Sequence, residues 1–258
     1  MRDMPARHRN LRALFEQSWQ FLTEKERQVI VQLSVFQGGF ERDAAQEVAD
    51  ATPFSLAALV DKSMLRAHSS GRYDMHELLR QFAAEKLEKT PDATQEARDG
   101  HCAYYASFLQ AREGQLIGAE QRQAVSDIAA DIDNVRAAWR WAVSCRRVPE
   151  IGQSLESLYL FYYARGWAQE GYETFDAALE HLERGLAIRR AVLGMDHPKT
   201  AESLDHLGNL LLAQGDLLMP HLLLNVVNRL EDLFPDQARQ LARLFLPDHR
   251  GAPGAAGQ

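Results

Sequence analysis

A histidine at the start of a predicted helix is the residue in this chain best placed to do chemistry. His76 follows a short extended segment, Arg72 to Met75, and opens an amphipathic helix that runs to Leu87. The first turn of a helix carries unpaired N–H groups and a partial positive charge, so it attracts anions. We therefore expect His76 to help hold a phosphate supplied by a neighbouring domain, although an ordinary core or surface histidine fits the same spacing. Histidine is not a preferred N-cap residue, so we expect it to be a poor cap but a good phosphate donor.

The residues before His76 predict several helices and one small hairpin. Apolar residues recur at helical spacing from Asn10 to Leu22, and a capping-box pattern from Thr23 to Glu26 opens the next helix, which Gly38 and Gly39 end. Thr52 and Pro53 give the cap and first-turn signals of another helix. Helices followed by a hairpin are the order of a winged-helix domain. The remaining predicted elements are helices at Glu41 to Asp50 and Pro53 to Asp61, and extended pieces at Met64 to His68 and Arg72 to Met75.

The rest of the chain is predicted to be helical. A cap-and-proline signal at Thr90 and Pro91 marks a boundary, after which helical patterns follow one another. Aromatic residues are dense between Trp139 and Trp167, and at helical spacing they favour packing between helices over a cofactor pocket. The helical runs are Ala93 to Glu113, Glu120 to Ser144 with a break near Asp131, Val148 to Arg165, and Ala168 to Leu193.

Composition excludes several classes of protein. The formal net charge of -7 argues against a general binder of nucleic acid, because that affinity comes largely from Lys and Arg. Cys102 and Cys145 lack metal-site or disulfide-scaffold spacing, so we expect reduced, buried thiols. The sequence has no run of about 18 to 20 apolar residues that could span a bilayer, and it opens on polar residues. A cytoplasmic protein without membrane contact is the simplest expectation.

Enzyme chemistry is not predicted. Acid pairs such as Asp131 and Asp133, or Glu24 and Glu26, stand two apart on helices, where they do not face one site, so we interpret them as solvated. His101 and Cys102 are adjacent and diverge on a helix, without a third orienting group. We find no metal-ligand spacing and no glycine-rich phosphate loop, so we expect no catalytic residues, no metal site and no cofactor in this chain.

Binding to DNA is the main alternative that a winged helix raises. The helix that would enter the major groove, Pro53 to Asp61, offers almost no side chain able to read base edges. Only Lys62, Arg66 and Arg72 supply nearby positive charge. Direct DNA binding is therefore disfavoured, and the apolar content of this helix suits packing against another domain.

Several sequence segments resemble one signalling family. The chain from Leu11 to Leu87 is similar to the winged-helix segment that follows the nucleotide-binding domain in STAND signalling ATPases, the NB-ARC-like superfamily that includes large bacterial transcription regulators. Later segments look like the helical arm that follows, and together the similarity covers most of residues 11–180. The matching segments are Ser18–Trp19, Leu33–Phe40, Leu59–Leu65, Met75–Arg80, Asp131–Ala138 and Arg165–Gly171.

The resemblance implies a role for His76. In that family the histidine of a Met-His-Asp motif contacts the ADP phosphate and holds the resting state, and Glu77 here replaces the aspartate. The sequence contains no G-x-x-x-x-G-K-[ST] loop, so ADP or ATP would be bound by an upstream nucleotide-binding domain. By resemblance, the chain is the regulatory part of an ATPase.

A second resemblance covers less of the chain. The segments Ala178–Arg189, Leu193–Ala201 and Ser203–Leu210, with Gln214 to Asp216, look like kinesin-light-chain-type tetratricopeptide repeats. Leu204, Leu207 and Leu211 form the packing stripe of a helix, and Gly208 allows a close approach. The opposite face of that helix either lines a partner-binding groove or is merely solvated. Its groove candidates are Glu202, Asp205 and Asn209.

After Asp216 the repeat pattern breaks, and Pro220 stands where a small helical residue is expected. A divergent capping helix and a truncated or frame-shifted array both explain this. We expect a mostly α-helical protein that couples an upstream nucleotide domain to a protein or peptide ligand; a DNA-binding regulator and a free-standing adaptor are the alternatives. The predicted organisation is a flexible N-terminus at 1–9, a winged helix at 10–89, a connector arm at 90–170, repeat-like helices at 171–246 and a flexible tail at 247–258.

Overall fold

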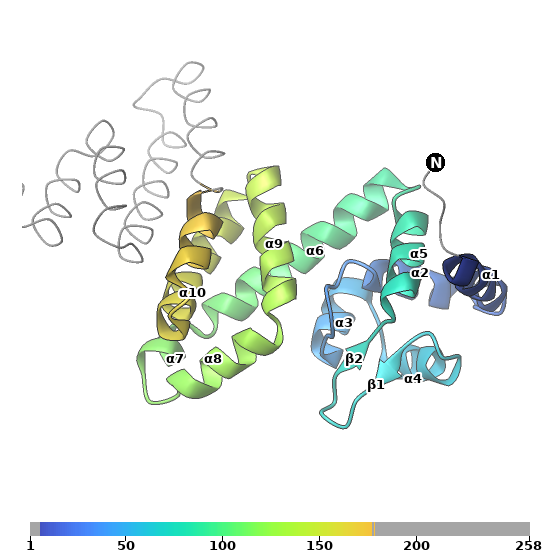
Figure 1. The fold of residues 1–258 in the computed structure, drawn as a ribbon, viewed down its shortest axis with the longest axis horizontal. Coiled ribbons are helices and arrows are strands. Elements are labelled where there is room, and N and C mark those ends of the chain that lie inside the picture. Colours follow the sequence, from blue (N-terminus) through green and yellow to red (C-terminus); the bar gives the residue numbers. More distant parts are fainter. Residues whose placement is uncertain (1–5, 177, 179–258) are drawn as a thin grey trace, which may run out of the picture. The chain divides into compact units, whose positions relative to one another are not determined.

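The computed structural model describes residues 6–176 and 178 (Figure 1). The chain divides into two units, which we describe separately. Unit 1 contains the residues up to 111 together with 126–142, and unit 2 contains 112–125 and the residues from 143 onward. The described part is mostly helical, with one small antiparallel sheet, which confirms the predicted fold class.

Two helices of unit 1 begin at the predicted cap signals, whereas the first helix begins at Ala6, ahead of the predicted Asn10. Thr23 accepts a hydrogen bond from the Glu26 N–H while the Glu26 carboxylate accepts one from the Thr23 N–H, which is the predicted capping box. Thr52 caps the next predicted helix through the Ser55 N–H, and Pro53 occupies its first turn. The helices are α1 (Ala6–Gln20), α2 (Glu24–Leu33), α3 (Arg42–Ala49), α4 (Pro53–Asp61), α5 (Glu77–Leu87) and α6 (Pro91–Gln110).

The predicted hairpin is present but very short. Strand β1 (Arg66–Ala67) pairs with β2 (Tyr73–Asp74), and Gly71 takes a φ of +82° in the connecting turn, which favours glycine. Phe40, in the loop after α2, extends this pairing. Its N–H donates to the Tyr73 carbonyl at 2.9 Å, and its carbonyl accepts from the Tyr73 N–H at 2.8 Å. The loop at Gly39 and the hairpin are therefore joined through the backbone.

The core of unit 1 forms around α2. This helix packs against α3, α4 and α5, while α1 covers α5 and both α3 and α5 contact α6 (Figure 1). Burying these apolar side chains is the main driving force for the fold. The fully buried large side chains in this unit include Ile30, Leu33, Phe36, Phe40, Leu56, Leu59, Leu79, Tyr105 and Leu109.

The remaining helices are α7 (Glu113–Ile117), α8 (Gln121–Ala130), α9 (Ile132–Cys145) and α10 (Val148–Arg165). The break predicted near Asp131 separates α8 from α9, whereas α7 was not predicted. In unit 2, α10 packs against α7, and Phe161 and Tyr162 are buried as predicted for packing aromatics. Phe175 is buried as well. Tyr163 is an exception at 66% exposed.

The expectations for the two cysteines and for the repeat helices have different outcomes. Cys102 is buried, but Cys145 is exposed at the end of α9, so the prediction of two buried thiols was half wrong. A further helix starts at Ala168 and is described as far as residue 176; the predicted repeat helices beyond it lie outside the described residues. Among the helices described, none is both long and apolar enough to cross a membrane.

Candidate functional site

His76 is the N-cap of α5. Its Nδ1 accepts a hydrogen bond from the Leu78 N–H at 3.2 Å, with the backbone at φ −57° and ψ 132°. His76 caps the helix although histidine is not a preferred cap residue, because an unprotonated ring nitrogen can accept this bond as the oxygen of Asn or Asp does. An accepting Nδ1 carries no proton, so the proton of the neutral ring lies on Nε2.

The surroundings of His76 leave its ring accessible. The residue is exposed, and its ring centroid lies 6.4 Å from that of Phe15 on α1. The Nε2 side of the ring is therefore open to an acceptor supplied by another domain or molecule. A phosphate oxygen at a helix N-terminus is one such acceptor.

Glu77 is engaged within its own helix. Its carboxylate accepts two hydrogen bonds of 2.8 Å from Arg80 and one of 2.8 Å from Gln81. The Arg80 guanidinium lowers the pKa of Glu77, even though partial burial opposes this. Arg80 also donates to the Ser34 carbonyl at 3.2 Å, which ties the start of α5 to the end of α2. Glu77 thus helps fix the helix that presents His76.

Helix α1 is held on α5 by charged side chains. Arg12 pairs with Glu85, and Lys86 pairs with Glu16 at 3.0 Å. The Lys86 ammonium also lies 4.8 Å from the centre of the Phe82 ring, which is a cation–π distance. These exposed pairs are individually weak. Together with Phe15 they bring α1 close to His76.

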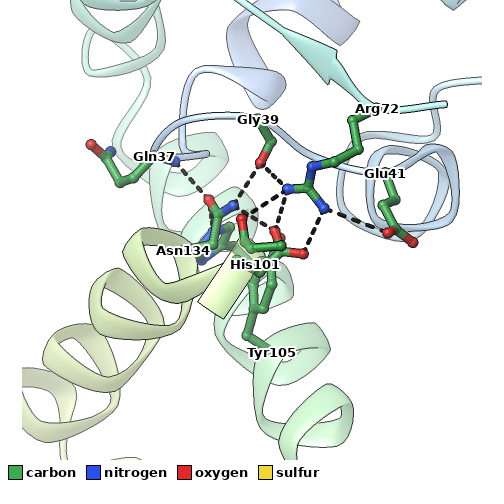
Figure 2. A network of polar contacts seen from close by, with 9 residues as sticks. Gln37, Gly39, Glu41, Arg72, His101, Tyr105 and Asn134 are labelled. Atoms are coloured by element: carbon green, nitrogen blue, oxygen red, sulfur yellow. Dashed lines mark hydrogen bonds and ion pairs between the residues drawn. The ribbon is translucent and has the colours of Figure 1, made fainter. Parts of the chain in front are cut away.

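A buried polar network lies elsewhere in unit 1 (Figure 2). Arg72, which follows the hairpin turn, donates two hydrogen bonds of 2.8 Å to the carboxylate of Asp131, between α8 and α9. The same guanidinium donates to the carbonyls of Gly39 at 2.9 Å and Ala130 at 3.3 Å. Only 18% of the Arg72 side chain and 5% of the Asp131 side chain are exposed, so this is a desolvated ion pair.

Asn134 on α9 completes the network. Its Oδ1 accepts from the Gln37 N–H at 2.7 Å, and its Nδ2 donates to the Gly39 carbonyl at 2.9 Å. The Asp131 carboxylate also accepts from Asn134 at 3.1 Å and from the Tyr105 hydroxyl at 3.0 Å. The loop after α2, the hairpin, α6 and the α8–α9 turn therefore meet at one set of hydrogen bonds (Figure 2).

Burial decides the charge states in this network. His101 lies against Phe36 and Tyr105, with its Nε2 3.4 Å from the Asn134 Oδ1, and burial lowers its pKa to about 4. Burial and the nearby Asp131 carboxylate raise the pKa of Tyr105, which stays a hydroxyl donor. The hydrogen bonds to Asp131 raise the pKa of Arg72. At neutral pH the network thus holds a neutral imidazole beside one buried ion pair.

This network was not predicted from the sequence, and two acidic residues that were expected to be solvated are buried. Asp131 was expected to be solvated, yet it is the buried partner of Arg72. Glu26 is likewise buried, and the Lys62 ammonium lies 2.6 Å from its carboxylate. Burial alone would raise the pKa of Glu26, but hydrogen bonds from Lys62 and Thr23 lower it. Asp133 and Glu24 are exposed, as predicted.

The three basic residues that the sequence places near α4 each form an ion pair with a carboxylate. Lys62 pairs with Glu26, Arg72 with Asp131, and Arg66 with Asp74 at 2.9 Å. Apart from Asp61, the exposed residues of α4 are apolar, and Phe54 is 84% exposed. In the described part of the chain, no group of three or more His, Cys, Asp or Glu side chains could hold a metal ion.

Comparison with known proteins supports the repeat prediction. The tetratricopeptide repeat family model matches residues 173–218. The groove candidates Glu202, Asp205 and Asn209 fall within this match but outside the described residues.

Three curated proteins are similar over a longer stretch. One is from Mycobacterium bovis and two are from strains of Mycobacterium tuberculosis, and each carries the name "Putative HTH-type transcriptional regulator". Each is 33% identical over 203 residues, covering 74% of this chain. The chain spans only 23% of the length of these relatives.

One solved structure was also matched. It is the crystal structure of a signal transduction ATPase with numerous domains (STAND) protein with a tetratricopeptide repeat sensor, from Pyrococcus horikoshii. The match covers 96% of this chain and 48% of that one at 15% identity, with a TM-score of 0.28.

Proposed function

We propose that this chain is the regulatory and protein-interaction part of a STAND-type signalling ATPase. It would couple the nucleotide state of an upstream domain to partner binding on repeat-like helices. The tetratricopeptide match at residues 173–218 is the observation that carries the interaction role, because such repeats stack into surfaces that bind other proteins. The sequence resemblance of residues 11–180 to the winged helix and arm of that family supports the regulatory role.

His76 is the proposed nucleotide-sensing residue. Its accessible Nε2–H at the start of α5 is a suitable donor to a phosphate of ADP bound by the upstream domain. Such a contact favours the resting state only if it is made with one nucleotide state and not the other. Glu77 takes part indirectly, by holding Arg80 and the first turn of α5 in place.

The chain itself is proposed to be non-catalytic and cytoplasmic. ADP or ATP would belong to the upstream domain, since the sequence lacks a phosphate-binding loop of the G-x-x-x-x-G-K-[ST] type. Glu202, Asp205 and Asn209 are the proposed contacts for a protein or peptide ligand. A free-standing adaptor would use the same three residues without nucleotide control.

A DNA-binding regulator is the second candidate, because the mycobacterial relatives carry the name of HTH-type regulators. The helix α4 argues against direct contact with DNA through this winged helix. Lys62, Arg66 and Arg72 each pair with a carboxylate, so binding phosphates would require breaking these pairs. Control of transcription through another domain of a longer protein remains compatible with our proposal.

The experiment compares two replacements of His76 in a protein that carries both this chain and its nucleotide-binding domain. His76→Asn keeps a good N-cap but removes the Nε2–H, whereas His76→Ala removes both. We expect both variants to release bound ADP at least tenfold faster than the wild type and to raise basal activity. Wild-type ADP retention by His76→Asn would overturn the sensing role, because only the cap would then matter.

The interaction role needs a separate test. A chain with Asp205→Ala and Asn209→Ala should bind its partner more weakly, measured by calorimetry against a partner isolated with the wild-type chain. Unchanged affinity would assign both residues to a solvated helix face. Since this assay contains no nucleotide, its outcome is independent of the His76 experiment.

A further inference from the structure

We propose that Arg72 and Asp131 form a latch that fixes the β1–β2 hairpin in one position against the α8–α9 turn. The latch sets the arrangement of these elements and adds little to the overall stability of unit 1. This inference concerns the fold of unit 1 and does not depend on the proposed function. Figure 2 shows the elements that Arg72 brings together.

The hairpin has little of its own to hold it in place. Each strand contains two residues, and an isolated two-stranded hairpin is marginal in water. The backbone of the hairpin is also attached to the loop after α2, through the bridge between Phe40 and Tyr73. Arg72 connects the hairpin to the α8–α9 turn through hydrogen bonds to Asp131 and to the Ala130 carbonyl.

The contacts of Arg72 are directional and shared. The Gly39 carbonyl accepts from both Arg72 and Asn134, and the Asp131 carboxylate accepts from Arg72, Asn134 and Tyr105. A two-pronged guanidinium–carboxylate pair fixes geometry more tightly than apolar contact does. A shift of the hairpin by one residue would leave the buried Asp131 charge without its partner, which is costly.

A buried ion pair is a poor source of net stability. Desolvating both charges offsets most of their attraction, so apolar residues of similar size can replace such a pair without loss of stability. Apolar side chains would fill the space between the hairpin and the α8–α9 turn but would not select one arrangement. If the Arg72–Asp131 pair mainly sets position, apolar replacement should therefore change the arrangement of the hairpin and leave the free energy of unfolding unchanged.

The test replaces the pair by apolar residues and measures position and stability separately. The chain carrying Arg72→Met and Asp131→Leu is compared with the wild type by urea unfolding and by amide hydrogen exchange. The reporters are the amides of His68 and Tyr73, which bond to the carbonyls of Arg72 and Phe40 at 2.8 Å. Buried amides of α2 provide the internal reference. Arg66→Met is the matched control, because Arg66 pairs with Asp74 on the same hairpin but is 67% exposed.

The proposal predicts an unchanged urea midpoint for the double variant and exchange at least tenfold faster at His68 and Tyr73, with α2 unaffected. Arg66→Met should leave both amides within twofold of the wild type. Wild-type exchange in the folded double variant would overturn the latch. A double variant as unstable as Arg72→Met alone would also overturn it, since the pair would then act as a stabiliser. If Arg66→Met made exchange at His68 and Tyr73 equally faster, the latch would be overturned too, because the loss of any cation would then loosen the hairpin.

Discussion

Arg72 of the hairpin and Asp131 of the α8–α9 turn form a two-pronged ion pair, although 59 positions separate them in the sequence. Each of the two contacts measures 2.8 Å, and both side chains are largely buried. Because Tyr105 and Asn134 donate to the same carboxylate, the charge of Asp131 is satisfied from three elements. Directional polar contacts therefore hold the hairpin against the α8–α9 turn.

Removing only one member of this pair should be strongly destabilising. Arg72→Ala leaves a buried carboxylate without its cation, and breaking a buried pair in this way costs about 3 kcal/mol. We expect the lower end of the usual range because Tyr105 and Asn134 still donate to Asp131. Urea unfolding of the variant measures the change in the free energy of unfolding.

Arg66→Ala is the control for this measurement, since its partner Asp74 lies on the same hairpin and Arg66 is exposed. An exposed pair contributes less than about 1 kcal/mol. Equal losses in the two variants would mean that burial of the Arg72 pair carries no energetic consequence.

His101 should make unit 1 less stable in mild acid. Burial lowers the pKa of His101 to about 4, whereas an unfolded histidine titrates near 6.5. Between these values the unfolded chain binds a proton that the folded chain does not, so stability is lost as the pH falls from about 6.5 to 4. The full loss corresponds to about 3 kcal/mol.

The measurement is the urea midpoint between pH 7 and pH 4 for the wild type and for His101→Gln. Carboxylates such as Glu26 and Asp74, whose pKa values are lowered in the fold, also lose stability as the pH falls. Their contribution is common to both proteins, so the difference between the two curves isolates His101. Parallel curves would contradict the prediction.

Local signals made most helix boundaries predictable. The capping box at Thr23, the proline in the first turn of α4 and the break at Asp131 all depend on neighbours within one helical turn. Such interactions leave a pattern in the sequence itself. The short hairpin was predictable for the same reason, because Gly71 marks its turn.

Tertiary contacts left no comparable pattern. Nothing adjacent to Asp131 indicates that Arg72 will neutralise it, so the sequence alone favoured the commoner exposed carboxylate. The sequence shows the glycine pair at Gly38 and Gly39. That the Gly39 carbonyl accepts hydrogen bonds from Arg72 and Asn134 depends on elements far along the chain. The cap bond of His76 could not be derived from general cap preferences, because it requires one tautomer of the ring.

Two glycines should respond oppositely to alanine. A Cβ at Gly39 would lie 3.2 Å from the Tyr73 carbonyl, so the hairpin or the Gly39 loop would have to move. A Cβ at Gly100, within α6, meets nothing within 4 Å. We expect Gly100→Ala to stabilise the chain by about 0.5 to 1 kcal/mol and Gly39→Ala to destabilise it. Thermal unfolding of both variants tests this, and a stabilising Gly39→Ala would show that the loop tolerates the close contact.

The two threonines at helix starts should also differ. Thr23 accepts the Glu26 N–H and caps α2, whereas Thr90 at the start of α6 makes no side-chain cap bond. Thr23→Ala should therefore cost about 1 kcal/mol, and Thr90→Ala should cost less. Chemical denaturation at neutral pH measures both values. If Thr90→Ala proved the costlier change, cap hydrogen bonding would not explain the difference.

His76 should stabilise α5 through its side chain, and the tautomer gives a direct test. Because Nδ1 accepts from the Leu78 N–H, nitrogen NMR of the neutral ring should show an unprotonated Nδ1 and a protonated Nε2. His76→Ala loses the cap and should destabilise the chain by about 1 kcal/mol, whereas His76→Asn keeps a good cap and should stay close to the wild type. A proton on Nδ1, or equal losses in both variants, would contradict the cap. If His76→Asn keeps wild-type stability, the helix that presents residue 76 is intact in this variant. The variant then tests the Nε2–H alone in the nucleotide experiment.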